Sequence, residues 1–160
     1  MTASDAVILE GHLSVRAAFE GKSRTIHRIL VRGGRIGRVV RSIERLAAAA
    51  GVPVERVERD EVMQRVTGRT HGGIIAEAGP RRYAGLDALA RDGGVPFVAM
   101  LDGFEDPFNY GQALRSLYAA GATGVVVAER DWESAAGTVA RASAGASERL
   151  PLANTEAAEA

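Results

Sequence analysis

The fold is decided by residues 96–128, PFVAMLDGFEDPFNYGQALRSLYAAGATGVVVA. The segment begins with a continuous apolar run, Pro96–Leu101, which is typical of a parallel strand covered on both faces. A polar loop follows, residues 109–120 predict a helix that ends at Gly121, and Gly124–Ala128 predict a second buried strand. A strand, a helix and another buried strand in this order indicate a parallel α/β sheet.

The sequence after this unit continues the alternation. Residues 134–147 predict a helix of small side chains, and Leu150–Leu152 predict a third, short strand. Asn154-Thr155 offers the cap of a further helix, but the sequence stops about one turn later. Three strands and two complete helices form half of a doubly wound sheet and leave one edge uncovered. We therefore expect the front part of a longer protein; a natural short form, or an edge covered by a partner chain, is the alternative.

The first half of the chain also alternates helix and strand signals. Helices are predicted at residues 11–20, 36–50 and 60–66, and strands at residues 27–31, 54–57 and 73–78. This alternation predicts a second, compact α/β layer. Residues 79–94 contain Gly and Pro near both ends and are interpreted as a linker between a domain of residues 1–78 and a domain of residues 95–160.

Charge separates the two halves, although the formal net charge of the whole chain is zero. Residues 1–82 hold 15 Lys and Arg against 9 Asp and Glu, or +6, and residues 83–160 hold 5 against 11, or −6. The basic side chains are densest between Arg16 and Arg45. A basic half indicates a polyanionic partner such as RNA, and a solvated basic surface without a partner is the alternative.

Composition excludes several classes of protein. Cysteine is absent and the three histidines have no metal-ligand spacing, so neither disulfides nor a metal site is expected. No apolar run reaches the roughly 18 residues of a membrane span, and the N-terminus lacks the basic start of a signal peptide. We therefore expect no membrane partner and a cytoplasmic location. The phosphate-binding loop, the nucleophile elbow and the zinc-binding helix motif are absent.

Chemically capable side chains gather where the first strand of the 96–128 unit gives way to its helix. Asp102, Glu105 and Asp106 lie in the connecting loop, at the carboxyl end of a parallel strand, where open α/β sheets bind ligands. Asn109 stands at or near the start of the helix. Opposite the apolar face, the helix carries a polar stripe of Gln112, Arg115, Ser116 and Ala119. From the residues alone, a helix cap at Asn109 and a solvated Arg115 remain the alternative.

Residues 101–127 resemble the first conserved motif of the SpoU-type RNA 2′-O-methyltransferases, within the SPOUT superfamily. The motif is Asn, one residue, Gly, three residues, Arg and then Ala-Gly, and it is matched here by Asn109, Gly111, Arg115, Ala120 and Gly121, with Asp106-Pro107 ahead. Residues 140–151 are similar to the next family segment. Residues 8–11, 51–57 and 71–78 resemble pieces of the family's N-terminal RNA-binding domain, whose fold is shared with certain ribosomal proteins.

The resemblance implies a small ribosomal-protein-like α/β RNA-binding domain, followed by an incomplete SPOUT methyltransferase domain with a parallel and normally knotted sheet. The family's second and third motifs, which form the knot and most of the S-adenosylmethionine pocket, are absent from these 160 residues. Cofactor-binding residues are therefore expected beyond Ala160, and appreciable binding of S-adenosylmethionine by this chain is not expected. Phe108 and Tyr110 replace the His and Leu expected most often around the motif Asn.

The resemblance also implies the reaction, which is methyl transfer from S-adenosylmethionine to a ribose 2′-hydroxyl of rRNA or tRNA. Arg115 matches the family's catalytic arginine, and Asn109 would support it. RNA contacts are predicted for Arg16, Lys22, Arg24, Arg28, Arg32, Arg35 and Arg141. Family members are homodimers, largely through the knot, so a dimer is not expected of this chain. Two alternatives remain, a non-catalytic RNA-binding module and an interaction protein whose exposed sheet edge recruits a partner.

Overall fold

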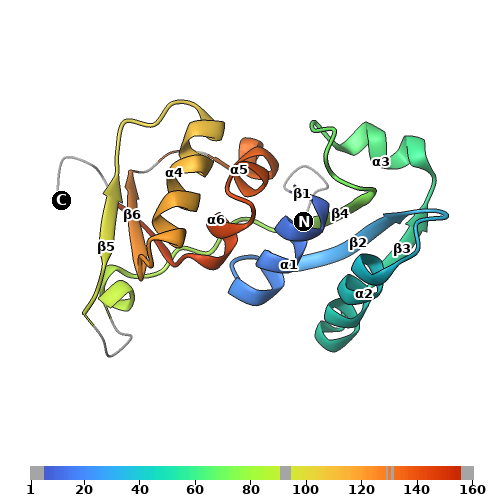
Figure 1. Ribbon diagram of the computed structural model, residues 1–160, viewed down its shortest axis with the longest axis horizontal. Coiled ribbons are helices and arrows are strands. Elements are labelled where there is room, and N and C mark those ends of the chain that lie inside the picture. The colour runs from blue at the N-terminus through green and yellow to red at the C-terminus, as the bar shows by residue number, and fades with distance from the viewer. Residues whose placement is uncertain (1–5, 91–94, 129, 131, 156–160) are drawn as a thin grey trace.

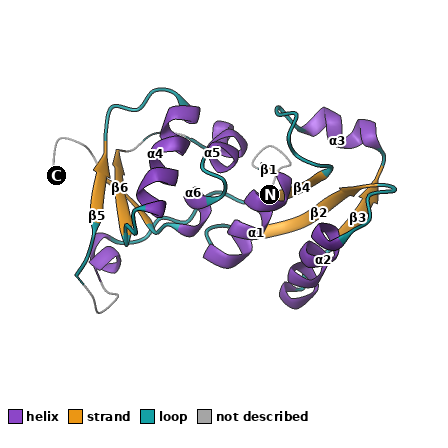
Figure 2. Cartoon of the chain, viewed as in Figure 1, coloured by secondary structure: helices purple, strands orange, loops and turns teal. Residues whose placement is uncertain are grey.

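The protein, seen here as a computed structural model that describes residues 6–90, 95–128, 130 and 132–155, folds into two α/β layers that lie side by side (Figure 1). Each layer has its own sheet and its own helices (Figure 2). The predicted α/β class is therefore confirmed.

The first sheet is built mainly from antiparallel pairs. Its strands are β1 (Val7–Glu10), β2 (Ile26–Arg32), β3 (Val54–Val57) and β4 (Ile74–Ala78), in the order β1-β4-β2-β3. β4 pairs antiparallel with both β1 and β2, whereas β3 runs parallel to β2. Successive side chains of a strand point to opposite faces, and in β2 both sets are buried, with Ile29 and Val31 in one core cluster and Leu30 in another.

Helices cover both faces of this sheet. α1 (Gly11–Gly21) and α2 (Arg38–Ala50) supply side chains to the cluster on one face, and α3 (Arg59–Arg65) supplies Val62 to the other. α2 buries Val40, Ile43 and Ala47, which recur at helical spacing, and it ends at Gly51 in the left-handed conformation, with φ of 68°. The periodicity thus placed this helix correctly to within two residues.

The second sheet is parallel. Its strands β5 (Val98–Leu101), β6 (Gly124–Ala128) and β7 (Leu152–Thr155) lie in the order β5-β6-β7. β6 is central and buries Val125 and Val127, whereas Val98 and Met100 of β5 are 41% and 44% exposed. The expectation that β5 is covered on both faces was wrong for the described residues, because β5 lies at the edge and only the face with Leu101 packs on the core.

Three α-helices belong to this second layer. They are α4 (Pro107–Ala119), α5 (Ala136–Ala142) and α6 (Ala146–Arg149), with 3₁₀ turns η2 (Leu86–Ala90) and η3 (Glu133–Ala135). The continuous helix predicted over residues 134–147 is broken, because Ala144 and Gly145 have φ of 52° and 84° and a left-handed backbone ends a right-handed helix. The third strand is found slightly later than predicted, and Asn154 and Thr155 lie within it rather than capping a helix.

The two layers share an apolar core. Ala136 and Ala140 of α5 belong to the same buried cluster as Leu9 and Val15 of the first layer. Glycines allow this close approach, since a Cβ at Gly137 would lie 2.6 Å from the backbone oxygen of Ile8, and one at Gly145 would lie 2.6 Å from the Cβ of Ala17.

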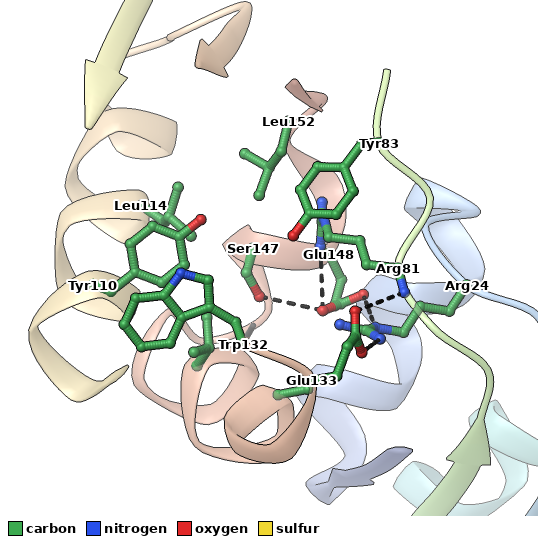
Figure 3. A pocket seen from close by; sticks show the side chains of 12 residues that line it. Arg24, Arg81, Tyr83, Tyr110, Leu114, Trp132, Glu133, Ser147, Glu148 and Leu152 are labelled. Atoms are coloured by element: carbon green, nitrogen blue, oxygen red, sulfur yellow. Dashed lines mark hydrogen bonds and ion pairs between the residues drawn. The ribbon is translucent and has the colours of Figure 1, made fainter. Parts of the chain in front are cut away.

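A buried ionic cluster also joins the layers (Figure 3). Glu148 of α6 is 2% exposed and accepts hydrogen bonds from Ser23 at 2.5 Å, Arg24 at 3.2 Å and Arg81 at 3.4 Å. Arg24 also donates to Glu133 at 2.6 Å, so two cations face two carboxylates. Burial lowers the pKa of Arg81, and the nearby Glu148 opposes this change. Buried charges persist only where such pairing offsets their desolvation.

Candidate active site

Helix α4 begins directly after the loop at the carboxyl end of β5. The carboxylate of Asp106 accepts a hydrogen bond from the backbone N–H of Asn109 at 2.7 Å and so caps the helix. Pro107 follows at the first helical position, where its missing N–H costs no hydrogen bond. Asn109 therefore lies near the helix start, as predicted, but the cap is Asp106.

Gly111 fixes how α4 sits on the layer. A Cβ at this position would lie 2.7 Å from the Cβ of Ala142 and 2.8 Å from the backbone oxygen of Val139, both on α5. The motif glycine is thus a contact point between two helices. Tyr110 and Leu114 are buried beside it. The opposite face of α4 is consequently turned outward.

The outward face carries the stripe predicted from the sequence, since Gln112, Arg115, Ser116 and Ala119 are all exposed. Asn109, Gln112 and Arg115 follow one another at three-residue intervals, and all three are exposed. Within the part of the chain that the structure describes, the Arg115 guanidinium makes no hydrogen bond or ion pair. Its five N–H donors are therefore available to a ligand. Tyr118, predicted on the apolar face, is 46% exposed.

A cavity of about 220 Å³ opens at the carboxyl ends of β5 and β6. Its lining includes Asp102, Phe104, Tyr110, Arg130 and Trp132. Arg130 donates a hydrogen bond to the backbone oxygen of Phe104 at 2.9 Å, and its guanidinium carbon lies 5.0 Å from the centre of the Trp132 ring. Trp132 in turn stacks on Tyr110 with ring centres 4.7 Å apart. Ligands of open α/β sheets bind at this edge.

The size of this cavity tests whether the residues present fit S-adenosylmethionine. Pockets for ligands of that size span roughly 300–1,000 Å³, and the cavity falls below this range. Its acidic lining residue, Asp102, already accepts a hydrogen bond from the backbone N–H of Gly103 at 2.7 Å. Burial raises the pKa of Tyr110, so its hydroxyl is no general base at neutral pH. The described residues therefore do not by themselves fit the cofactor.

Two of the residues predicted to contact RNA are engaged between the layers. Arg24 is 7% exposed and belongs to the Glu148 cluster, and Arg141 contacts the buried carboxylate of Glu10 at 2.5 Å. A phosphate would have to compete with these buried carboxylates for the guanidinium of either arginine, which is unfavourable. These two arginines therefore have a structural role between the layers, and their contact with RNA stays a prediction.

Two further members of the set have polar partners within the first layer. Arg28 contacts Glu77 at 2.7 Å and Glu55 at 3.3 Å, and the hydrogen bond from Arg28 lowers the pKa of Glu77. Arg16 donates to the hydroxyl of Ser42 at 2.8 Å.

The other three members, Lys22, Arg32 and Arg35, make no side-chain hydrogen bond or ion pair with any residue that the structure describes. Arg32 and Arg35 line a second cavity, which they share with Arg59, Arg69 and His71. Sequence reasoning missed these last three. The only local signal is the sequence RTHGG at residues 69–73, a turn that follows a basic residue.

Among residues 6–90, 95–128, 130 and 132–155, no three His, Asp or Glu side chains are grouped so that they could hold a metal ion. No helix in the same residues has the length and apolar character of a membrane span.

Family models match both layers. Residues 8–84 match a model described as RNA 2′-O ribose methyltransferase substrate binding, and residues 96–160 match the SpoU rRNA Methylase family. An α/β substrate-binding layer followed by a parallel layer with the Asn109–Arg115 motif defines the class of SpoU RNA methyltransferases. The chain belongs to the SpoU family, so the resemblance drawn from its sequence is confirmed.

Curated relatives are also named as RNA methyltransferases. The chain is 33% identical over 143 residues to the 23S rRNA (guanosine-2′-O-)-methyltransferase RlmB of Pseudomonas putida, an alignment that covers 87% of this chain and 57% of the relative. It is 38% identical over 112 residues to the putative TrmH family tRNA/rRNA methyltransferase YacO of Bacillus subtilis, covering 68% of this chain and 45% of the relative. The chain thus spans about half the length of the curated relatives it matches.

Solved structures show the same fold. A crystal structure of an RNA 2′-O ribose methyltransferase superposes with a TM-score of 0.72 at 24% identity and covers 97% of this chain and 57% of its own. The AdoMet-bound rRNA methyltransferase of Sinorhizobium meliloti superposes with a TM-score of 0.73 at 22% identity, with 98% and 56% covered.

Proposed function

We propose that this chain is the RNA-recognising and substrate-orienting part of an enzyme that methylates the ribose 2′-hydroxyl of rRNA or tRNA. S-adenosylmethionine would supply the methyl group. The observation that carries the proposal is Arg115, exposed and without a side-chain partner among the described residues, in a family motif whose Gly111 anchors the helix on α5. Curated relatives of this chain are named as RNA methyltransferases.

The role of Arg115 follows from the weak nucleophilicity of a ribose hydroxyl. The hydroxyl must give up its proton as its oxygen displaces S-adenosylhomocysteine from the methyl group, and a fixed positive group stabilises the negative charge that builds on the oxygen before the new bond is complete. An arginine stays protonated near neutral pH and is a reluctant base, so Arg115 would stabilise the alkoxide or hold the neighbouring phosphate through its planar fork. Asn109, which lies near the start of the same helix, would orient the loop and support Arg115.

A non-catalytic RNA-binding module is the second candidate. The observation that favours it is the cavity of about 220 Å³, which does not fit the cofactor. In either case the partner is RNA, and we propose a cytoplasmic location. The family resemblance implies that full-length members are homodimers. We do not expect this chain alone to form a dimer.

One assay separates the two candidates. The full product of the gene is incubated with S-adenosylmethionine labelled in its methyl group and with unmodified rRNA and tRNA, and the RNA is digested to nucleosides. We expect label in 2′-O-methylated nucleosides. Tight RNA binding without transferred label would establish the module and overturn the enzyme.

A further inference from the structure

The second cavity of the first layer is the strongest unassigned site. It has a volume of about 420 Å³, within the range of about 300–1,000 Å³ found for small-ligand pockets. It lies between α3, the end of β2 and the turn that leads into β4. Its lining residues are Arg32, Arg35, Arg59, Val62, Met63, Arg69, His71, Gly72 and Gly73.

The charge of this cavity is unbalanced. Its four arginines make no side-chain hydrogen bond or ion pair within the described ranges, and none of the lining residues that the structure describes is acidic. This differs from the arginines between the layers, such as Arg24, which face carboxylates. Four cations around one hollow repel one another, and a bound anion relieves that repulsion. Burial and the charges of Arg16 and Arg35 lower the pKa of the neighbouring His12, in keeping with a positive field.

The rim of the cavity is shaped by two glycines. Gly72 and Gly73 have φ of 61° and 75°, in the left-handed region that side chains disfavour. A Cβ at Gly73 would lie 3.0 Å from the Cβ of Arg32, so this glycine also allows the turn to approach β2 closely. The backbone N–H of Arg32 donates to the oxygen of Gly73 at 2.8 Å and closes the contact.

His71 supplies a directed donor. Its Nδ1 accepts a hydrogen bond from the backbone N–H of Gly73 at 3.1 Å. This bond requires a lone pair on Nδ1, so the proton of the neutral ring sits on Nε2. Nε2–H is then the remaining donor of a histidine that lines the cavity. Val62 and Met63 give the same cavity an apolar wall.

We propose that this cavity binds one unpaired, phosphorylated nucleotide of the RNA substrate. The phosphate would contact the arginines, and the base would stack on a guanidinium plane, as unpaired bases do in RNA recognition, with the apolar side chain of Met63 beside it. A flat basic surface would bind any phosphate backbone, whereas a cavity with an apolar wall favours an unpaired nucleotide whose base is exposed. The inference deepens the proposed function and rests on RNA being the partner.

The test compares two double variants of the full chain with equal charge change. Arg59→Ala/Arg69→Ala removes two exposed arginines of the cavity, and Arg38→Ala/Arg41→Ala removes two exposed arginines of α2, on the opposite face of the sheet (Figure 1). Binding of a fluorescent single-stranded RNA and of a duplex of equal length is measured by anisotropy at several salt concentrations, with thermal unfolding as the check of folding.

We expect the parent to prefer the single strand and the cavity variant to lose at least about tenfold in affinity for it, the effect of one lost charge-assisted hydrogen bond. Its log–log salt slope should fall by about 0.7 for each lost phosphate contact. The α2 variant should stay within about threefold of the parent, since it retains every such bond in the cavity. Equal losses in both variants, or equal binding of duplex and single strand, would overturn the cavity proposal while leaving RNA binding intact. A parent that binds no RNA would overturn both proposals.

Discussion

The role of each arginine in this chain depends on whether carboxylates surround its guanidinium. Arg24 faces two carboxylates in a buried cluster, and its removal would leave Glu148 short of a partner. Arg115 is exposed and unpartnered among the described residues, and it stands on a helix anchored from behind by Gly111. The first kind of arginine supports the fold and the second kind is free to bind a ligand.

Helical periodicity is a local signal, so the stripe containing Arg115 could be predicted from the sequence. The carboxylate partners of Arg24 lie more than a hundred residues away along the chain and could not be predicted.

The first prediction concerns Arg115 in a protein that also contains the family's second and third motifs. We expect Arg115→Ala to lower methylation by about 10²–10³, the usual cost of removing a preorganised charge from a developing oxyanion. Arg115→Lys should rescue poorly, because a point charge cannot replace a planar fork. Single-turnover methylation at saturating RNA measures both effects.

Folding and RNA binding should survive this substitution, since Arg115 fills no core space and exposed substitutions usually cost little stability. Thermal unfolding and RNA titration are the controls. A methylation rate within about threefold of the parent would be far from the loss expected for a missing oxyanion donor, and it would show that Arg115 has no catalytic role.

At the scale of elements, strands and helices with regular apolar spacing were predictable, and their order in space was not. The segment 96–101 has the composition of a central strand, but the parallel order places β5 at the edge. The helix predicted over residues 134–147 has no proline to announce its break, which depends on the left-handed Ala144 and Gly145. The basic cavity was missed for the same reason, because the end of β2 meets α3 and the turn before β4 only through packing.

The second prediction concerns α6. Glu148→Gln should lower the free energy of unfolding by about 3–5 kcal/mol, because it removes one charge from a buried ionic cluster and leaves the facing arginines short of a partner. The matched control is Glu20→Gln, which breaks the exposed interlayer pair between Glu20 and Arg149 and should cost about 1 kcal/mol or less. Urea unfolding measures both variants. Equal and small effects would show that the buried cluster contributes little.

At the scale of the whole molecule, the opposite charges of the two halves acquire a second explanation. The +6 and −6 balances were interpreted as the mark of a polyanion-binding half. Part of that charge instead joins the halves to each other, because Arg24 and Arg81 of the basic half face Glu133 and Glu148 of the acidic half. The arginines left over, above all those of the cavity, are the ones available to RNA.

The third prediction concerns the 160-residue chain as a whole. We expect no binding of S-adenosylmethionine in the micromolar range, because the cavity at the ends of β5 and β6 is smaller than such a ligand requires. Isothermal titration calorimetry measures this directly, and RNA binding by the same sample shows that the protein is folded. A micromolar dissociation constant would mean that these residues suffice for the cofactor and that the expectation of no appreciable cofactor binding is wrong.

The core shared by the two layers has a consequence for folding during synthesis on the ribosome. β1 is among the first residues to be made, yet Ala136 and Ala140, which complete its buried cluster, follow more than a hundred residues later. At a synthesis rate of about 5–20 residues per second, the first sheet waits several seconds with an apolar surface in water. The order of translation and the order of burial therefore differ. The part of the cluster that α5 covers therefore stays exposed until α5 has been made.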